Sequence, residues 1–187
     1  MKPLPKIVFQ HFREPQNLGA LADPTAVGEV DGRGPDTKLR LFLQVEDGTV
    51  TDASFETVRD RASNAPLSLL TTMIKGRALA EVESLDVADI GEHFGLYEEN
   101  LPMLVPAWET LQATLAALAG KPNPYAFEGG LVCTCLGVRE GRIRRAIKER
   151  ECRTVREVSF WTRACTGCRS CRGDIERMLG EDRREAV

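Results

Sequence analysis

Apolar and polar residues alternate along residues 39–45, and the apolar ones share one face of an extended chain: Leu39, Leu41, Leu43 and Val45. This period of two is typical of a β-strand with one buried face. Residues 46–48, Glu-Asp-Gly, supply a turn, and residues 50–55 can return as an antiparallel partner. The pattern predicts a β-hairpin.

Two later stretches repeat apolar residues at the spacing of an α-helix. The first ends before Gly76 and comprises Leu67, Leu70, Met73 and Ile74. The second ends before Gly120 and comprises Leu104, Trp108, Leu111, Leu115 and Leu118. Glycine after the last periodic residue is a common helix stop. We expect an α+β fold in which helices cover a small antiparallel sheet, with the methionine and aromatic residues of these stripes in its core.

The last third of the chain predicts three short helices. Apolar faces identify the first and the third, at Ile143, Ala146 and Ile147 and at Ile175, Met178 and Leu179, the third ending at Gly180. Thr154 and Glu157 form a capping box for the second, which carries Val155, Val158 and Trp161. We expect a small all-α, cysteine-rich module. Its core is thin, and domains this small usually need a metal or disulfides for stability.

Composition changes sharply near residue 130. All six cysteines follow it: Cys133, Cys135, Cys152, Cys165, Cys168 and Cys171. Residues 131–187 hold 14 Lys and Arg against 9 Asp and Glu, a net charge of +5, whereas residues 1–130 hold 11 against 19, a net charge of −8. A Gly- and Pro-rich stretch separates the two regions. We therefore predict a domain at 1–120, a linker at 121–130 and a second domain at 131–182.

Several classes of protein do not fit this chain. No apolar run reaches the roughly 18 residues of a membrane span, and two prolines and then charge interrupt the N-terminus before a signal-peptide core could form. The basic residues are interspersed with acids and aromatic residues are few, which argues against nucleic-acid binding. We expect a cytoplasmic protein.

The cysteine spacing admits three kinds of chemistry. Cys133 and Cys135 precede the first short helix, and Cys165, Cys168 and Cys171 precede the third, so two thiol pairs are expected to converge. Structural disulfides do not suit a cytoplasmic chain. Four thiolates suit either a structural zinc ion or a [2Fe–2S] cluster, and spacing alone leaves both open. Helix N-termini favour thiolates beside them, and nearby arginines could offset a negative centre: Arg139, Arg142, Arg169 and Arg172.

Residues 132–179 carry further features of a known module. A C-x-C pair is followed by 32 residues and then a C-x2-C pair, with I-R-R-A-I after the first pair and D-I-E after the second. This segment resembles the [2Fe–2S] module of the nitrogen-fixation scaffold NifU and of bacterioferritin-associated ferredoxin. The resemblance implies a [2Fe–2S] cofactor and assigns its metal ligands as Cys133, Cys135, Cys168 and Cys171. Cys165 then stands where that family commonly has a small residue, and we expect Cys152 to be a small packing residue.

The first region, over residues 7–119, resembles the U-type scaffolds IscU and the N-terminal domain of NifU. The pattern H-x-x-x-P-x-N-x-G occurs at residues 11–19. Residues 27–30 are similar to the first strand of that family, and residues 52–57 and 72–79 to its later strand and helix. Those scaffolds build a cluster on three cysteines. Here the aligned positions are Pro35-Asp36-Thr37, Asp60 and Asn100-Leu101, which cannot support soft iron–sulfur chemistry. A hard-cation site at Asp36, Asp60 and Asn100 is conceivable, but we expect these to be solvated surface residues.

The resemblances imply three functions. In the first, which we favour because NifU joins these modules in the same order, the chain is an accessory protein in iron–sulfur cluster assembly, repair or delivery. Its partners would be a cysteine desulfurase or apo-acceptor proteins, with a homodimer left open. The second is a ferredoxin-like electron carrier with a redox partner, and the third a redox or iron sensor. We expect no enzyme, since the two histidines, His11 and His93, have no nucleophile beside them in the pattern.

Overall fold

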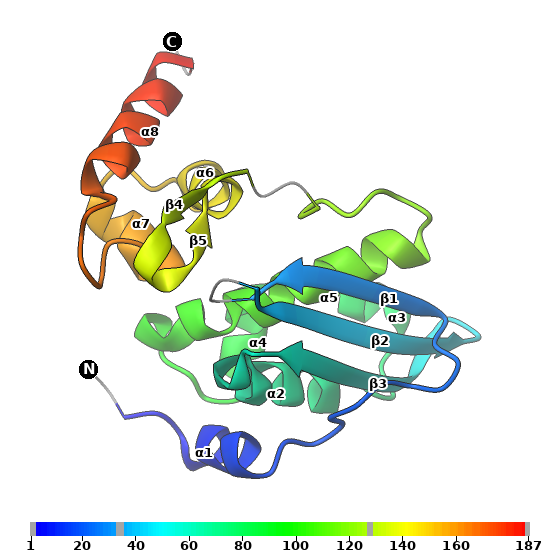
Figure 1. The fold of residues 1–187 in the computed structure, drawn as a ribbon. Helices are drawn as coiled ribbons and strands as arrows, with labels where there is room; N and C mark the ends of the chain where they lie inside the picture. The colour runs from blue at the N-terminus through cyan, green and yellow to red at the C-terminus, as the bar shows by residue number, and fades with distance from the viewer. Residues whose placement is uncertain (1–2, 33–35, 127–128, 186–187) are drawn as a thin grey trace. The chain divides into compact units, whose positions relative to one another are not determined.

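The computed structural model describes residues 3–32, 36–126 and 129–185, which fall into two compact units (Figure 1). We call residues 3–32 and 36–126 the N-terminal unit and residues 129–185 the C-terminal unit. Each unit has its own cluster of buried apolar side chains. None of the described helices is both long and apolar enough to cross a membrane.

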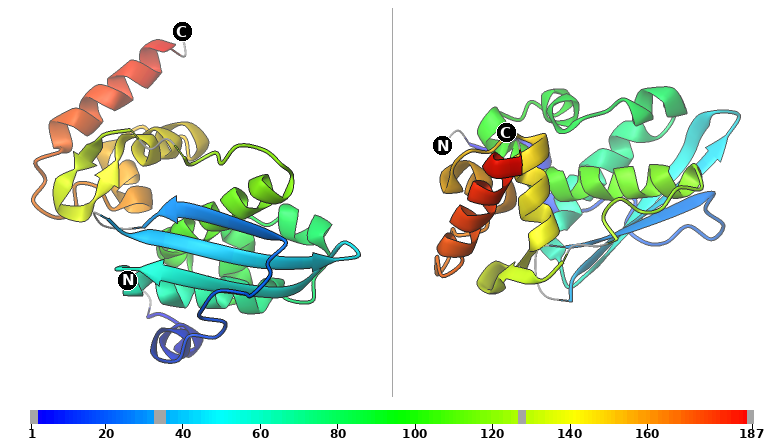
Figure 2. Two further views of the ribbon diagram at one scale, coloured as in Figure 1. Left: turned by 45° about the vertical axis from the view of Figure 1, so that its right-hand side comes forward. Right: turned by 90° about the horizontal axis from the view of Figure 1, so that it is seen from above.

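The N-terminal unit has a three-stranded antiparallel sheet in the order β1-β2-β3, with helices on one of its faces (Figures 1 and 2). Helix α5 packs on β1 and β2, α2 packs on β3, and α1 packs on α2. The elements are α1 (Lys6–Arg13), β1 (Ala26–Asp31), β2 (Lys38–Glu46), β3 (Thr49–Val58), α2 (Asn64–Ile74), α3 (Leu79–Glu83), α4 (Val87–His93) and α5 (Val105–Leu118), with 3-10 turns η1 (Arg61–Ser63) and η2 (Glu98–Met103).

The predicted hairpin is confirmed as β2 and β3, which pair Leu41 with Phe55. Its turn takes left-handed backbone at Asp47 and Gly48, with φ of 48° and 72°. The two predicted helices are confirmed as α2 and α5. The polypeptide leaves them through Gly76 and Gly120, whose φ values of 81° and 65° a glycine adopts without steric cost.

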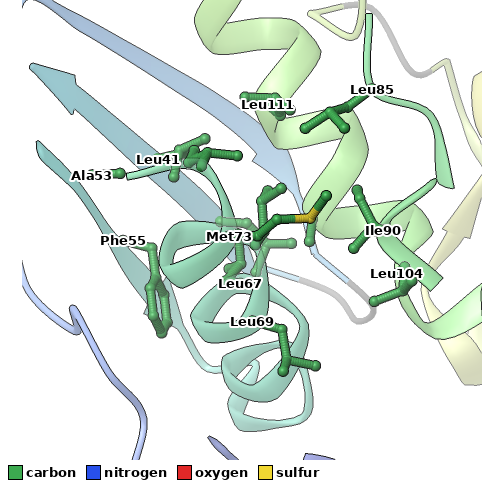
Figure 3. Close-up of a cluster of buried hydrophobic side chains, with 14 of the residues drawn as sticks. Leu41, Ala53, Phe55, Leu67, Leu69, Met73, Leu85, Ile90, Leu104 and Leu111 are labelled. Carbon is green, nitrogen blue, oxygen red and sulfur yellow. The ribbon is translucent and has the colours of Figure 1, made fainter. Parts of the chain in front are cut away.

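The core of this unit lies between the sheet and its helices (Figure 3). Its buried side chains include Leu41, Ala53, Phe55, Leu67, Leu69, Met73, Leu85, Ile90, Leu104 and Leu111. Gly28 of β1 lets α5 approach closely, because a Cβ there would lie 2.7 Å from the Cα of Thr114. Trp108 is partly buried at the edge of the core and donates its indole N–H to the Leu85 carbonyl at 2.9 Å. The expectation that these apolar stripes form a core is confirmed.

The opening motif of the chain anchors the first residues to the sheet and to α2. Asn17 and Gly19 exchange backbone hydrogen bonds with Phe55 of β3 at 3.0 and 2.8 Å. His11 is buried, and its Nδ1 is 2.7 Å from the Ser68 hydroxyl. Burial lowers the pKa of His11, since it disfavours the charged ring. The motif that carries the family resemblance therefore has a structural role here.

The C-terminal unit comprises β4 (Leu131–Cys133), η3 (Thr134–Leu136), β5 (Val138–Arg139), α6 (Glu140–Glu149), α7 (Val155–Thr162) and α8 (Arg172–Glu185). Helices occur at all three predicted places, and the Thr154–Glu157 capping box is confirmed. Two predictions were wrong. The unit is not all-α, because β4 and β5 form an antiparallel pair, which Gly137 allows by turning the chain with a φ of 68°. Helix α8 also continues through Gly180, since an interior glycine costs only about 1 kcal/mol relative to alanine.

Candidate metal centre

The four predicted ligands come from two loops of the C-terminal unit. Cys133 ends β4 and Cys135 lies in η3, whereas Cys168 and Cys171 lie in the segment 163–171 that leads into α8. One cysteine of each pair is buried: Cys133 is 1% exposed and Cys171 is 2% exposed. The other two, Cys135 and Cys168, are exposed. The centre therefore has a buried side and an exposed edge. Each of the two loops contributes one sulfur to the buried side and one sulfur to the exposed edge.

The structure brings these sulfur atoms together. The Sγ atoms of Cys133 and Cys135 are 3.8 Å apart, and those of Cys135 and Cys168 are 3.3 Å apart. Cys171 forms a hydrogen bond with Cys133 on the buried side. Metal–sulfur bonds of about 2.3 Å in a tetrahedron place two sulfurs roughly 3.8 Å apart, so these contacts are close to the spacing of two thiolates on one metal.

The segment 163–171 turns its backbone N–H groups toward the sulfurs. Three residues in it that are not glycine have left-handed backbone: Arg163, Cys165 and Arg169, with φ of 64°, 64° and 62°. The N–H of Cys168 bonds to the Cys135 sulfur, that of Ser170 to the Cys168 sulfur, and that of Cys165 to the Cys171 sulfur. Such donors stabilise thiolates and tune a metal–sulfur centre.

Gly167 makes room for one of these sulfurs. A Cβ at this position would lie 3.1 Å from the Sγ of Cys135, closer than carbon and sulfur ordinarily approach. A side chain at position 167 would therefore require the Cys135 thiol or the loop to shift by a few tenths of an ångström.

The environment separates the pKa values of the thiols. Hydrogen bonds from the Ser170 side chain and backbone lower the pKa of Cys168 to about 7, with a further contribution from Cys135. The Cys168 N–H lowers the pKa of Cys135, but thiol neighbours and desolvation outweigh it and the pKa is raised. The Cys168 and Cys135 sulfurs are joined by a hydrogen bond at 3.3 Å. Burial and the neighbouring Cys133 raise the pKa of Cys171 to about 12.

The two remaining cysteines occupy different places. Cys152 is 1% exposed, lies between α6 and α7, and has its pKa raised to about 11 by burial and by the nearby Glu157. Its position agrees with the expected packing role. Cys165 is 9% exposed and belongs to the same buried cluster as Cys133 and Cys171. Its position beside Cys171 could not be read from the spacing, because Cys168 is nearer to it along the chain.

Arg172 and Arg139, which were expected to help offset a negative centre, bind other groups. Arg172 pairs with Glu176 at 2.8 Å, and Arg139 donates to the carbonyl of Gly129 at 3.3 Å. Arg169 is exposed beside Cys168. Part of the positive charge near the exposed edge therefore belongs to arginine side chains that already bind other groups of the protein.

The positions aligned with the scaffold cysteines differ from expectation. Asp60 and Asn100 are 6% and 8% exposed, so the expectation of solvated surface residues was wrong for both, although Asp36 is exposed. Asp60 begins η1 and accepts hydrogen bonds from the Ser63 hydroxyl at 2.8 Å and the Ser63 N–H at 3.2 Å. It stabilises a turn. Pro35 lies outside the described residues.

Among residues 3–32, 36–126 and 129–185, no three His, Cys, Asp or Glu side chains form a group placed to hold a metal ion. The contacts between cysteine sulfurs described above each join two cysteines. In the described part of the N-terminal unit, Asp36 and Asp60 form no such group with a third His, Cys, Asp or Glu side chain.

Comparison with known proteins defines the class that this fold and this thiol cluster represent. Residues 5–124 match the family model described as NifU-like N terminal domain, and residues 131–181 match the model described as BFD-like [2Fe-2S] binding domain. The chain thus joins a scaffold-type unit to a BFD-like [2Fe–2S] binding domain. It belongs to the NifU-like family.

Individual relatives agree with this assignment. The nitrogen fixation protein NifU of Trichormus azollae is 32% identical over 184 residues, covering 92% of this chain and 61% of the relative. The iron-sulfur cluster assembly scaffold protein IscU of Azotobacter vinelandii is 31% identical over 129 residues, covering 67% of this chain and 95% of the relative. The chain therefore spans about three fifths of the length of the NifU relative.

Among solved structures, the N-terminal part of a NifU-like protein from Brucella abortus is similar. It is 17% identical with a TM-score of 0.49, covering 63% of this chain and 94% of that one.

Proposed function

We propose that this protein binds a [2Fe–2S] cluster through Cys133, Cys135, Cys168 and Cys171 and takes part in the assembly, repair or delivery of iron–sulfur clusters. The observation that carries the proposal is the series of pairwise contacts that links four thiols from two loops, with three backbone N–H groups directed at their sulfurs. The relatives' names, nitrogen fixation protein and cluster assembly scaffold protein, support the cellular role.

The residues present suit this cofactor. Iron–sulfur clusters are held by soft thiolate ligands, and the four cysteines supply them without any other donor. Gly167 leaves space beside the Cys135 sulfur, and the N–H donors favour thiolate over thiol. When bound, the cluster would supply one-electron chemistry and transferable iron and sulfide.

The N-terminal unit has a different role in this proposal. Residues 1–130 contain no cysteine, so this unit cannot hold a cluster on thiolates as a three-cysteine scaffold does. Asp60 and Asn100, two of its polar residues at the aligned positions, are buried, and Asp60 is engaged in a turn. We infer that it docks on assembly partners, such as a cysteine desulfurase or an apo-acceptor protein. A cytoplasmic location, where thiols stay reduced, belongs to the same proposal.

A second candidate function is electron transfer. Cys135 and Cys168 form an exposed edge of the centre, which suits electron exchange with a redox partner as well as cluster transfer. An electron carrier keeps its cluster through many reductions, whereas a delivery protein gives it up. The two functions therefore differ in whether the cluster is still bound to the protein after the protein has met its partner.

The first experiment purifies the chain without oxygen and measures iron, sulfide and zinc together with the visible absorption spectrum. We expect two irons and two sulfides per chain, about the content of one [2Fe–2S] cluster. A colourless protein with zinc in place of iron would end the proposal. Cys152→Ala is the control variant and should keep the iron and sulfide content of the parent chain, because it removes a buried thiol that lies outside the two ligand loops.

The second experiment mixes the loaded protein with an apo-ferredoxin and follows the cluster by circular dichroism. Transfer to the apo-ferredoxin supports assembly or delivery. A cluster that stays on the protein and cycles reversibly by one electron, with donation to an oxidised cytochrome, supports electron transfer instead.

A further inference from the structure

The exposed edge of the centre holds two thiols from different loops in direct contact. The Sγ atoms of Cys135 and Cys168 are 3.3 Å apart, although 33 positions separate these residues along the chain. Both side chains are exposed, whereas Cys133 and Cys171 are 1% and 2% exposed. An oxidant in solution can therefore reach Cys135 and Cys168, while burial shields the other two ligand thiols.

Backbone contacts hold Cys135 against the loop that carries Cys168. The N–H of Cys168 bonds to the Cys135 sulfur, and a Cβ at Gly167 would lie 3.1 Å from that sulfur. On its other side, the Sγ of Cys168 is 3.2 Å from the Ser170 hydroxyl. The two loops thus position both sulfurs, and a covalent bond between them needs only a further approach to about 2.05 Å.

We propose that Cys135 and Cys168 form a reversible disulfide in the chain that carries no cluster, and that this disulfide blocks cluster loading until it is reduced. The proposal rests on the function proposed above for the four ligand cysteines. The disulfide removes two of the four ligand thiolates in one step, and Cys133 and Cys171 remain thiols. Loading of the centre then depends on the redox state of its exposed edge.

Hydrogen peroxide is the oxidant for this step. The thiolate of one cysteine attacks a peroxide oxygen, which breaks the O–O bond and gives a sulfenic acid and one water. The second thiol then attacks the sulfenic sulfur, forms the S–S bond and releases a second water. The two sulfurs lose two electrons in all, and the peroxide gains them. A dithiol reverses the reaction by thiol–disulfide exchange.

The structure favours this link over one within the C-x2-C loop. The Cys171 sulfur is buried and forms a hydrogen bond with Cys133, whereas the Cys168 sulfur is exposed and contacts Cys135. A bond across 33 positions also restricts the unfolded chain more than a bond across three positions does. The link between loops would therefore hold the C-terminal unit together in place of the metal.

The test uses the full parent chain, stripped of metal by a chelator and a reductant without oxygen and then treated with one equivalent of hydrogen peroxide. Free thiols are alkylated, and tryptic peptides are analysed by mass spectrometry. Arginines lie between the three thiols to be distinguished, so trypsin releases them in separate peptides: Cys135, Cys168 and Cys171. We expect the first two peptides to be linked, the third to be alkylated, and dithiothreitol to reverse the link.

Alanine variants assign the link to single residues, because Cys133 shares a tryptic peptide with Cys135, and Cys165 shares one with Cys168. C133A and C165A should keep the link, and C135A and C168A should lose it. C152A is the control and should keep the link, because it removes a buried thiol outside the two loops.

The consequence for loading is measured with ferrous iron and sulfide, supplied without oxygen to the oxidised and the reduced parent chain. We expect the reduced chain to load and the oxidised chain to load only after dithiothreitol is added. Alkylated Cys135 and Cys168 after peroxide, a link between Cys168 and Cys171, or equal loading of both chains would overturn the proposal. A reduced chain that forms the link on oxidation but takes up no iron would instead overturn the function on which the proposal rests.

Discussion

The N-terminal unit buries leucines, isoleucines and a phenylalanine between a three-stranded sheet and its helices, whereas the C-terminal unit has cysteines among its buried residues. In the described part of the C-terminal unit, four of these buried side chains are cysteines: Cys133, Cys152, Cys165 and Cys171. The first unit can be stabilised by apolar burial alone. The second has too few apolar side chains, and bound metal would contribute directly to its folding.

The largest expected effect comes from removing one ligand in each loop. The double variant of Cys133→Ala and Cys168→Ala should bind no cluster, and its C-terminal unit should lose protection from hydrogen exchange, because metal binding and folding are coupled in small domains. The amides of β2 and α5 should stay protected. Retention of colour and iron by this variant would refute the ligand assignment, and loss of protection in both units would refute their independence.

A buried phenylalanine tests the opposite unit. Phe55→Ala should lower the free energy of unfolding of the N-terminal unit by about 3–5 kcal/mol, since Phe55 is fully buried and a cavity would remain. Iron content should not change. Phe12→Ala is the control, because Phe12 is 55% exposed and exposed substitutions usually change stability by less than about 0.5 kcal/mol. Chemical denaturation monitored by circular dichroism measures both, and similar losses would contradict the assigned core.

A single methyl group tests the space beside Cys135. Gly167→Ala should weaken cluster retention about tenfold, because the added Cβ would lie 3.1 Å from the Cys135 sulfur. Gly173→Ala, in the first turn of α8, meets no atom within 4 Å and should leave retention unchanged. The rate of iron loss to a chelator measures both variants. Equal rates would mean that the loop yields to the methyl group.

The two units share one device, a helix capping box, which allows a direct comparison. Thr154→Ala in α7 and Asp86→Ala in α4 should each cost about 1 kcal/mol, because each removes a side-chain acceptor from the first turn of a helix. The same loss should shift the melting temperature of the smaller unit further. Differential scanning calorimetry of the loaded chain resolves the two shifts, and a larger shift with Asp86→Ala would contradict the ranking.

The smallest expected effect is the pH dependence from His11. Burial lowers the folded-state pKa of His11 below 6.5, so the unfolded chain binds more protons there than the folded one. The stability contributed by the neutral ring is present above pH 6.5 and is lost as the pH falls below it. His11→Gln should reduce this loss in the N-terminal unit, and His93→Gln, which changes an exposed histidine, should not. Denaturation curves at several pH values measure the difference.

Local patterns predicted the elements that local physics controls. The alternation at 39–45, the helical stripes before Gly76 and Gly120 and the Thr154 capping box each depend on residues a few positions apart, and the structure has them at those places. Helix α1 was not predicted, since it buries only Val8 and His11, too few residues for a helical pattern, and these are buried because α1 packs on α2. The β4–β5 pair was also missed, because strands this short have no periodic signal.

The amino-acid sequence alone established which unit can supply thiolate ligands to a metal. Residues 1–130 contain no cysteine, so they cannot supply a thiolate however they fold. The sequence could not settle which sulfurs are buried, that the Cys165 N–H bonds to the Cys171 sulfur, or that Asp60 and Asn100 lie inside the N-terminal unit. Those outcomes depend on how segments distant in the chain pack against one another. Burial and the direction of a backbone N–H are properties of that packing, and spacing along the chain does not encode them.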